Sequence, residues 1–255
     1  MLTKNNKNII KSLYKPHGRK KYNLCICEGV RCCEEYMFTE KVSDIEFVVK
    51  SDTFDFPDHY KLIPDEKKFS IKKDEFEKLT PTKNSQGLLL IVKKPEISIN
   101  KFKTGTENFI IVLDKISDPG NMGTIIRTLK AAGLRSLYIT PGCADPFSEK
   151  VIRSALSAQF YIEIIKLDGD LYELLNNAGI NKIWRTDCHQ GDSLFEIPEL
   201  YNNSAIIFGS EAFGVSKIEN SIPVTIPMPG NSESLNVAQA VTVFIFEAVR
   251  RTILK

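Results

Sequence analysis

Three loops rich in small and polar residues carry the side chains of this sequence that could do chemistry. They cover residues 117–128, 209–216 and 226–230, the last continuing into 234–237. Glycines at strand ends let backbone amides and carbonyls approach a ligand closely, so a fold with few charged groups can hold a nucleoside there. Because each loop follows an apolar run, we expect the three to share one crevice.

In the first loop, Arg127 is the side chain best suited to chemistry. A turn is predicted at 118–120, and Asn121 then starts a helix whose amides point toward the loop. Arg127 lies four residues after Gly123, on the same helix face. Helical side chains lean toward the N-terminus of their helix, which brings the guanidinium toward the crevice, where it would suit a phosphate. The alternative is an ordinary surface arginine.

The other two loops add a carboxylate and two short polar side chains. Glu211 follows Gly209 at the end of a predicted strand over 205–208, and Ser234 and Asn236 frame the third loop. Simpler roles are open for two of these side chains. Glu211 could cap the next turn, and Ser234 could N-cap the final helix.

None of the three loops contains a histidine. His17, His59 and His189 fall outside them, which leaves neither an obvious histidine base nor a Ser-His-Asp set. The sequence also has no G-x-G-x-x-G or Walker loop, which disfavours dinucleotide-binding and ATP-binding enzymes of those types.

The elements around these loops predict an α/β domain over residues 108–255. Phe109–Leu113 is an unbroken apolar run typical of a strand covered on both faces. A helix to about Ala132, stopped by Gly133, and a strand at Ser136–Thr140 complete a βαβ unit. Further strands are expected at 161–166, 183–186, 205–208 and 224–227, and helices at about 149–159, 171–177 and 235–252.

A smaller α/β domain is predicted over residues 1–95. We expect a basic helix over 1–21, strands at 22–27, 45–49 and 87–92, and helices at about 32–39 and 70–79. The polar stretch that follows, with Pro95 and Gly105, has little periodicity, and we expect a linker over 96–107.

Charge is distributed unevenly along the chain. Residues 1–105 carry 21 Lys and Arg against 15 Asp and Glu, a net of +6, whereas the rest carries 13 against 17, a net of −4. The first 21 residues hold seven basic side chains and no acid. Such a basic N-terminal segment suggests a polyanion partner, because contacts between basic side chains and phosphates release counterions and so supply affinity. The alternative is that these residues are simply a solvated N-terminus, which would have the same composition.

Several classes of protein are disfavoured. No stretch reaches the roughly 18 apolar residues of a membrane span, and the N-terminus has no signal-peptide core, so we expect a soluble, cytoplasmic protein without a membrane partner. Four of the six cysteines lie in Cys25–Cys33, with a spacing that matches no familiar zinc site. We expect reduced, packed thiols and no metal.

The three loops resemble the signature motifs of the SpoU/TrmH RNA 2′-O-ribose methyltransferases of the SPOUT superfamily. They match in order and separation across about residues 106–255, at 121–128, 209–214, 226–230 and 234–237. The front of the chain resembles the family's ribosomal-protein-L30e-like substrate-binding domain through Arg19, residues 28–31 and Gln86-Gly87, a shorter match. Ser157, Ala212 and Ala238 depart from the usual patterns but keep small side chains.

The resemblance implies a fold and a set of site residues. The fold is a C-terminal α/β trefoil knot that binds S-adenosyl-L-methionine, an exception to the rule that chains do not thread themselves, preceded by the small L30e-like α/β domain. The implied cofactor contacts are Thr140, Gly209, Ile226, Met228 and Leu235. The implied catalytic residues are Arg127, Asn121, Glu211, Ser234 and Asn236. Contacts to RNA are expected from Lys15, Arg19, Lys20, Lys21 and Arg31.

A homodimer through the knotted domain is also implied. The final predicted helix is apolar on most sides, which independently argues for a dimer contact.

The implied reaction takes a proton from a ribose 2′-hydroxyl as its oxygen attacks the cofactor's methyl group. Arginine, with a pKa above about 12, is a poor base. We therefore expect Arg127 to grip a phosphate and stabilise developing oxyanion charge, with a substrate phosphate or Glu211 as proton acceptor.

The expected function is ribose methylation of structured RNA, with 23S-type ribosomal RNA favoured over transfer RNA because of the front domain. Two alternatives stay open. One is a knotted enzyme that methylates a base, and the other is a non-catalytic RNA-binding or ribosome-assembly protein.

Overall fold

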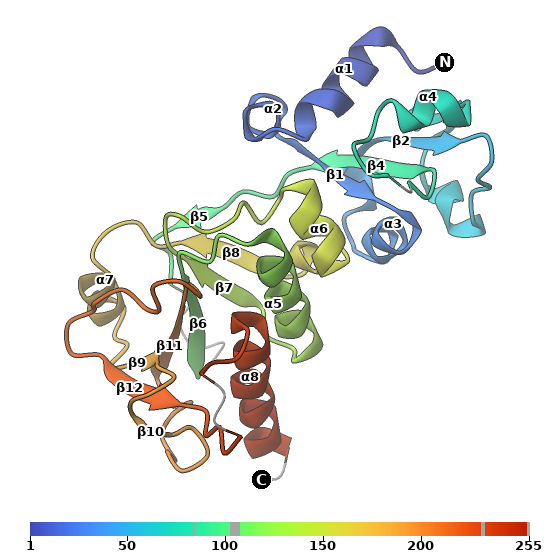
Figure 1. Ribbon diagram of the computed structural model, residues 1–255. Helices are drawn as coiled ribbons and strands as arrows, with labels where there is room; N and C mark the ends of the chain where they lie inside the picture. The colour runs from blue at the N-terminus through green and yellow to red at the C-terminus, as the bar shows by residue number, and fades with distance from the viewer. Residues whose placement is uncertain (84, 103–107, 231–232, 254–255) are drawn as a thin grey trace. The chain divides into compact units, whose positions relative to one another are not determined.

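The computed structural model describes residues 1–83, 85–102, 108–230 and 233–253 (Figure 1). The chain divides into two compact units. The first contains Met1–Glu96 together with Asp145–Tyr161, and the second contains Ile97–Ala144 and Ile162–Lys255.

The first unit has a four-stranded sheet in the order β1-β4-β2-β3. Its strands are β1 (Leu24–Glu28), β2 (Ile45–Ser51), β3 (Lys68–Ile71) and β4 (Leu88–Lys93). β4 is antiparallel to both β1 and β2, and β3 runs parallel to β2. The helices of this unit are α1 (Lys4–Leu13), α2 (Pro16–Tyr22), α3 (Val30–Met37), α4 (Lys73–Glu77) and α6 (Glu149–Ala155).

Two sequence expectations fail in this unit. The single basic helix is wrong: Lys15 is extended (φ −108°, ψ 145°) and Pro16, which fits only the first turn of a helix, begins a second one. The helix expected over 70–79 is also wrong in its first part, because Phe69 and Ile71 lie in β3 and pair with Val49 and Ser51 of β2.

Residues 145–161 group with the N-terminal chain, although they follow the predicted linker in sequence. Arg19 forms an ion pair with Asp145, with its Nη2 2.7 Å from Oδ2. Ser157 has φ +59°, and its Oγ donates to the carbonyl of Cys32 at 2.8 Å. This bond to a buried partner offsets the cost of a left-handed backbone at a residue with a Cβ.

The second unit has an eight-stranded sheet in the order β10-β12-β9-β11-β6-β7-β8-β5. Every neighbouring pair is parallel. The strands are β5 (Ser98–Ile99), β6 (Phe109–Asp114), β7 (Ser136–Ile139), β8 (Glu163–Lys166), β9 (Lys182–Thr186), β10 (Asp192–Ser193), β11 (Ser204–Gly209) and β12 (Ile222–Thr225). β5 lies inside the predicted linker, and a strand of two residues is too short for its sequence pattern to predict. Residues 103–107 of that linker lie outside the described residues.

Helices cover both faces of this parallel sheet, as its apolar strands require (Figure 1). On one face, Val112 and Ile207 share a buried cluster with Leu175 of α7 (Leu171–Asn177). On the other face, Phe208 meets Phe244 of α8 (Val237–Ile253), with ring centroids 5.2 Å apart.

The helix α5 (Pro119–Ala131) lies beside α8 (Figure 1). The hydroxyls of Thr128 and Thr242 are 3.3 Å apart across this contact. Because all the strands are parallel, the loops that follow them meet at one edge of the sheet, which is where open α/β sheets bind ligands.

Candidate active site

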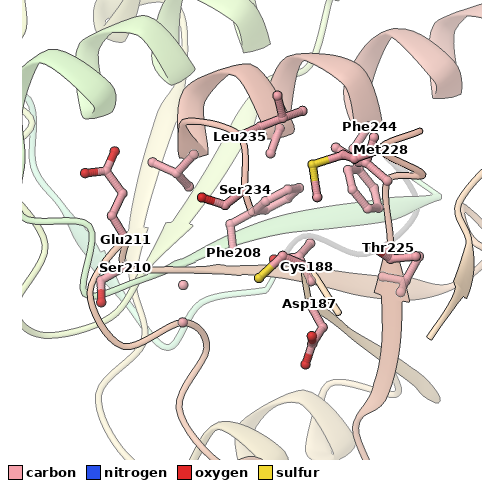
Figure 2. A pocket seen from close by; sticks show the side chains of 17 residues that line it. Asp187, Cys188, Phe208, Ser210, Glu211, Thr225, Met228, Ser234, Leu235 and Phe244 are labelled. Atoms are coloured by element: carbon pink, nitrogen blue, oxygen red, sulfur yellow. The ribbon is translucent and has the colours of Figure 1, made fainter. Parts of the chain in front are cut away.

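A cavity lies where β9, β11 and β12 end, beneath the N-terminal part of α8 (Figure 2). Ser210 and Glu211 are at one end of it, and Thr225, Met228 and Phe244 are at the other (Figure 2). The residues that line it are Thr186, Asp187, Cys188, Phe208, Gly209, Ser210, Glu211, Gly214, Val224, Thr225, Ile226, Met228, Ser234, Leu235, Val237, Ala240 and Phe244.

Backbone bends form one wall of the cavity. After β11, the Gly214 N–H donates to the carbonyl of Ser210 at 2.8 Å, which closes a tight turn. A Cβ placed on Gly209 would lie 1.9 Å from the carbonyl carbon of Gly214, a distance that no side chain can occupy. Gly209 is therefore required for the turn to close beside the cavity.

Three side chains from three different loops meet beside the cavity. Asn121 Nδ2 donates to Glu211 Oε1 at 2.8 Å, and Asn236 Nδ2 lies 3.0 Å from both Glu211 Oε1 and Asn121 Oδ1. The predicted convergence of the three loops is thus confirmed for this trio, which we call the carboxylate cluster. The second carboxylate oxygen of Glu211 accepts no hydrogen bond from the described residues.

Helix ends hold the two asparagines of the cluster. Asp118 Oδ1 accepts the Asn121 N–H at 2.8 Å and caps α5, with proline in the first turn. Asn236 Oδ1 accepts the Ala238 N–H at 2.9 Å and caps α8. Asn236, and not Ser234, therefore takes the capping position that was left open as the simpler role for Ser234, and Ser234 lines the cavity.

A buried aspartate at the end of β6 fixes the far end of the β11 loop. Asp114, 2% exposed, accepts the Ser216 N–H at 2.7 Å and the Thr140 hydroxyl at 2.9 Å. Thr140, an expected cofactor contact, does not line the cavity, and its hydroxyl has this structural partner. Asp114 was missed, although an acid that ends an apolar run is a visible signal.

The charged side chains that line the cavity are both carboxylates, Asp187 and Glu211, and its lining residues include no lysine, arginine or histidine. Partial burial opposes the charged form of Asp187, but bonds from the His189 N–H and from Arg185 outweigh it and lower the pKa of Asp187. The cavity therefore favours a cationic ligand over a phosphate. Asp187 lies outside the three motif loops and was missed, because no pattern in the sequence marks it.

Four of the five expected cofactor contacts line the cavity: Gly209, Ile226, Met228 and Leu235. Their roles, like those of the expected catalytic residues, stay predictions. Arg127 is exposed on α5, is absent from the lining and makes no hydrogen bond or ion pair with the described residues. Asn121 is the residue that joins α5 to the cavity.

The expected RNA contacts fall into two groups. Lys15, Lys20, Lys21 and Arg31 are exposed. Arg19 is only 3% exposed, and its guanidinium is bound to Asp145 and to the carbonyl of Leu13. Arg19 does not fit an RNA contact, because burial and these partners make it a structural residue.

The searched residues, those that the structure describes, contain no cluster of His, Cys, Asp and Glu able to hold a metal ion. Among the same residues, no helix combines the length and the hydropathy that crossing a membrane requires.

Comparison with known proteins gives relatives over nearly the full chain. The 23S rRNA (guanosine(2553)-2′-O)-methyltransferase RlmP of Bacillus subtilis is 29% identical over 245 residues, which cover 92% of each chain. The 23S rRNA (uridine(2479)-2′-O)-methyltransferase of Streptomyces viridochromogenes is 27% identical over 175 residues, covering 65% of this chain and 61% of that protein.

Solved structures agree with these relatives. A TrmH-family RNA methyltransferase structure from Porphyromonas gingivalis superposes with a TM-score of 0.79 at 25% identity, covering 98% of this chain and 99% of that chain. The SpoU methyltransferase AviRb of Streptomyces viridochromogenes, solved with AdoMet, has the same fold, with a TM-score of 0.79, 22% identity and the same coverage.

The model of the SpoU rRNA Methylase family matches residues 108–246, more than half of the chain. With its parallel sheet and the convergence of its three motif loops, the chain belongs to this family.

Proposed function

We propose that this protein transfers a methyl group from S-adenosyl-L-methionine to a ribose 2′-hydroxyl of 23S-type ribosomal RNA. The observation that carries this proposal is the carboxylate cluster, where three motif loops meet at the edge of a cavity. The relative RlmP, alike over 92% of both chains, supports large-subunit ribosomal RNA over transfer RNA.

The cavity fits the proposed cofactor, which supplies a methyl group on a positively charged sulfur. Leu235, Met228 and Phe244 offer an apolar surface of the kind that holds an adenine ring. Glu211 and Asp187 supply negative charge for a sulfonium. The lack of basic lining residues makes the same cavity a poor fit for a cofactor that carries phosphates.

Glu211 is suited to accept the proton that the ribose hydroxyl loses. One of its oxygens is held by Asn121 and Asn236, which fixes the direction of the other. A base positioned in this way contributes about 10²–10⁴-fold to a rate. The exposed Arg127 binds a backbone phosphate of the RNA and stabilises negative charge as it develops on the substrate.

We further propose how the chain is threaded, how it binds RNA and how it pairs. The chain is threaded as a trefoil knot, and its N-terminal unit is an L30e-like RNA-binding domain that contributes Lys15, Lys20, Lys21 and Arg31. Two copies pair through the C-terminal unit, where Phe246 on α8 is 45% exposed. We place the reaction in the cytoplasm, where ribosomal RNA is available as substrate.

Ribose-methylation mapping of ribosomal RNA, with and without the protein, tests the proposal. We expect one site in large-subunit RNA that resists alkaline cleavage, and the position equivalent to the RlmP target is the first to inspect. A new modification that leaves the linkage sensitive to alkali would show base methylation. An unchanged methylation map, together with failure of the protein to bind S-adenosylmethionine, would favour the non-catalytic RNA-binding alternative.

A further inference from the structure

Phe213 has an exposed aromatic ring on the β11 loop. Its side chain is 92% exposed, more than any other large hydrophobic side chain of the described residues except that of Met1. Its ring stacks on no other ring among those residues. Single exposed hydrophobic residues are common on protein surfaces, so exposure alone carries no inference.

The turn that carries Phe213 forces the ring outward. The Phe213 N–H donates to Ser210 Oγ at 3.3 Å, and the Gly214 N–H donates to the Ser210 carbonyl at 2.8 Å. The base of the turn has no room for a side chain, because even a Cβ on Gly209 would lie 1.9 Å from the carbonyl carbon of Gly214. No space remains inside the turn for an aromatic side chain.

The same loop is fixed on both sides of Phe213. Before it, the two asparagines of the carboxylate cluster hold Glu211. After it, Ser216 donates its N–H to Asp114 at 2.7 Å and accepts a bond from Lys115 Nζ at 2.8 Å. A ring on a loop fixed at both ends loses little conformational entropy when a ligand covers it.

Phe213 belongs to the loop at one end of the cavity, although its own side chain is not among the lining residues. Glu211 and Gly214, on either side of it in the chain, both line the cavity, and Ser210 and Glu211 mark one end of it (Figure 2). Phe213 is two residues from Glu211 in the chain, so a ribose that reaches Glu211 brings its own base, and the next base along the strand, close to the loop that carries this exposed ring.

We infer that Phe213 is a stacking surface for an unpaired base of the substrate RNA, at or next to the methylated nucleotide. The inference rests on the proposed function. Proteins that recognise unpaired RNA stack its bases on aromatic rings, which accept any base because every base has a flat face. Phe213 is thus a positioning residue, which acts by holding the nucleotide rather than by touching the reacting atoms.

Substitutions of Phe213 test this role in the full-length protein. The RNA is large-subunit ribosomal RNA, freed of protein, from cells that lack this methyltransferase. We expect Phe213→Ala to raise KM for this RNA about 5- to 150-fold, the usual effect of losing one stacked base. Affinity for S-adenosylmethionine and the melting temperature should not change. Phe213→Trp and Phe213→Tyr should restore KM, and Phe213→Leu should not.

A matched control and a spectroscopic signal complete the test. Phe195→Ala removes another exposed ring of the same unit, 51% exposed and outside the cavity lining, and should have no effect. The single tryptophan of the chain, Trp184, is buried. The fluorescence that Phe213→Trp adds should therefore be quenched by the RNA as a base stacks on it.

Each other outcome is decisive. A wild-type KM for Phe213→Ala, or full rescue by Phe213→Leu, overturns the inference, and so does unquenched fluorescence of Phe213→Trp with bound RNA. Separation of subunits by Phe213→Ala in sedimentation would make the ring a protein contact instead. A wild-type protein that transfers no methyl group to ribose overturns the proposed function, and quenching by RNA still tests the stacking role.

Discussion

Two glutamates, one in each unit, are held by pairs of hydrogen bonds with different consequences. Glu28, at the end of β1, is 2% exposed, and each of its carboxylate oxygens has a partner: the Thr80 hydroxyl at 2.6 Å and the Tyr14 hydroxyl at 3.1 Å. Glu211 is exposed, and both of its bonds fall on one oxygen. The buried carboxylate has both oxygens paired within its unit, whereas the exposed one keeps an oxygen without a hydrogen bond from the described residues, as the proposed proton acceptor requires.

The same contrast separates two arginines. Arg19 is buried and bound to Asp145, whereas Arg127 is exposed and pairs with none of the described residues. Burial and complete pairing mark structural charge, whereas an exposed charge without a partner among the described residues is free to meet a ligand.

The largest effect is expected from Arg127. Arg127→Ala should lower the rate of methyl transfer about 10²–10³-fold, because it removes a cation from the developing negative charge. Affinity for S-adenosylmethionine, measured by calorimetry, should barely change, since Arg127 does not line the cavity. Arg127→Lys is the matched control and should keep part of the rate. A fully active Arg127→Ala protein would refute the role.

Gly209 tests whether the cavity is the cofactor site. Gly209→Ala places a methyl group against the backbone of Gly214, so the turn must open. We expect the affinity for S-adenosylmethionine to fall about 10-fold or more, because an overpacked contact costs about 1–3 kcal/mol. Gly133→Ala is a control outside the cavity: its Cβ meets nothing within 4 Å, and the cost of a side chain at φ +78° falls on the end of α5 instead of on the cavity. If the two variants bind S-adenosylmethionine with equal affinity, the cofactor site is not this cavity.

Glu247 extends the comparison to a third carboxylate, on α8. Hydrogen bonds from Arg250 and then Arg251 outweigh burial and lower the pKa of Glu247 from 4.5 to about 2. Because the folded-state pKa is the lower one, this stabilisation is complete above about pH 4.5 and is lost as the pH falls toward 2.

Urea unfolding of the wild type and Glu247→Gln measures this effect. The variant should be less stable by about 1–3 kcal/mol at pH 7, the value of hydrogen bonds to a charged group. The gap should shrink as the pH falls below 4.5. A gap that does not vary with pH would contradict the assignment.

The smallest expected effect is on the labelling rate of Cys188, which reports whether the cofactor occupies the cavity. Cys188 is exposed and lines the cavity, whereas Cys25, Cys27 and Cys33 are buried, and burial raises the pKa of each of these three thiols. Iodoacetamide should label Cys188 first, as mass spectrometry would detect. S-adenosylmethionine at ten times its Kd should slow that labelling about 10-fold by occupying the site. Cys188→Ser is the control, and labelling that the cofactor does not slow would count against the site.

Much of this molecule could be predicted from its sequence. The strand at Phe109–Asp114 and the final helix from Val237 were predictable because long apolar runs fix their type. The meeting of Asn121, Glu211 and Asn236 followed from motif order and parallel topology.

Other features depend on contacts that local sequence does not encode. The two residues of β5 gain their strand conformation from pairing with β8, and Asp187 reaches the cavity because β9 lies between β11 and β12. The burial of Arg19 depends on Asp145, which is 126 residues away in the chain. Because Arg19 lies in a basic segment, its sequence context did not predict that it would be buried.

Paired measurements on Glu28→Gln and Glu211→Gln test the central claim most directly, with unfolding free energy and methyl-transfer rate determined for both. Glu28→Gln should lose about 1–3 kcal/mol of stability and keep its rate at temperatures where it is folded. Glu211→Gln should stay within about 0.5 kcal/mol of the wild type and lose about 10²-fold or more in rate. A stable Glu211→Gln enzyme with full activity would contradict the account.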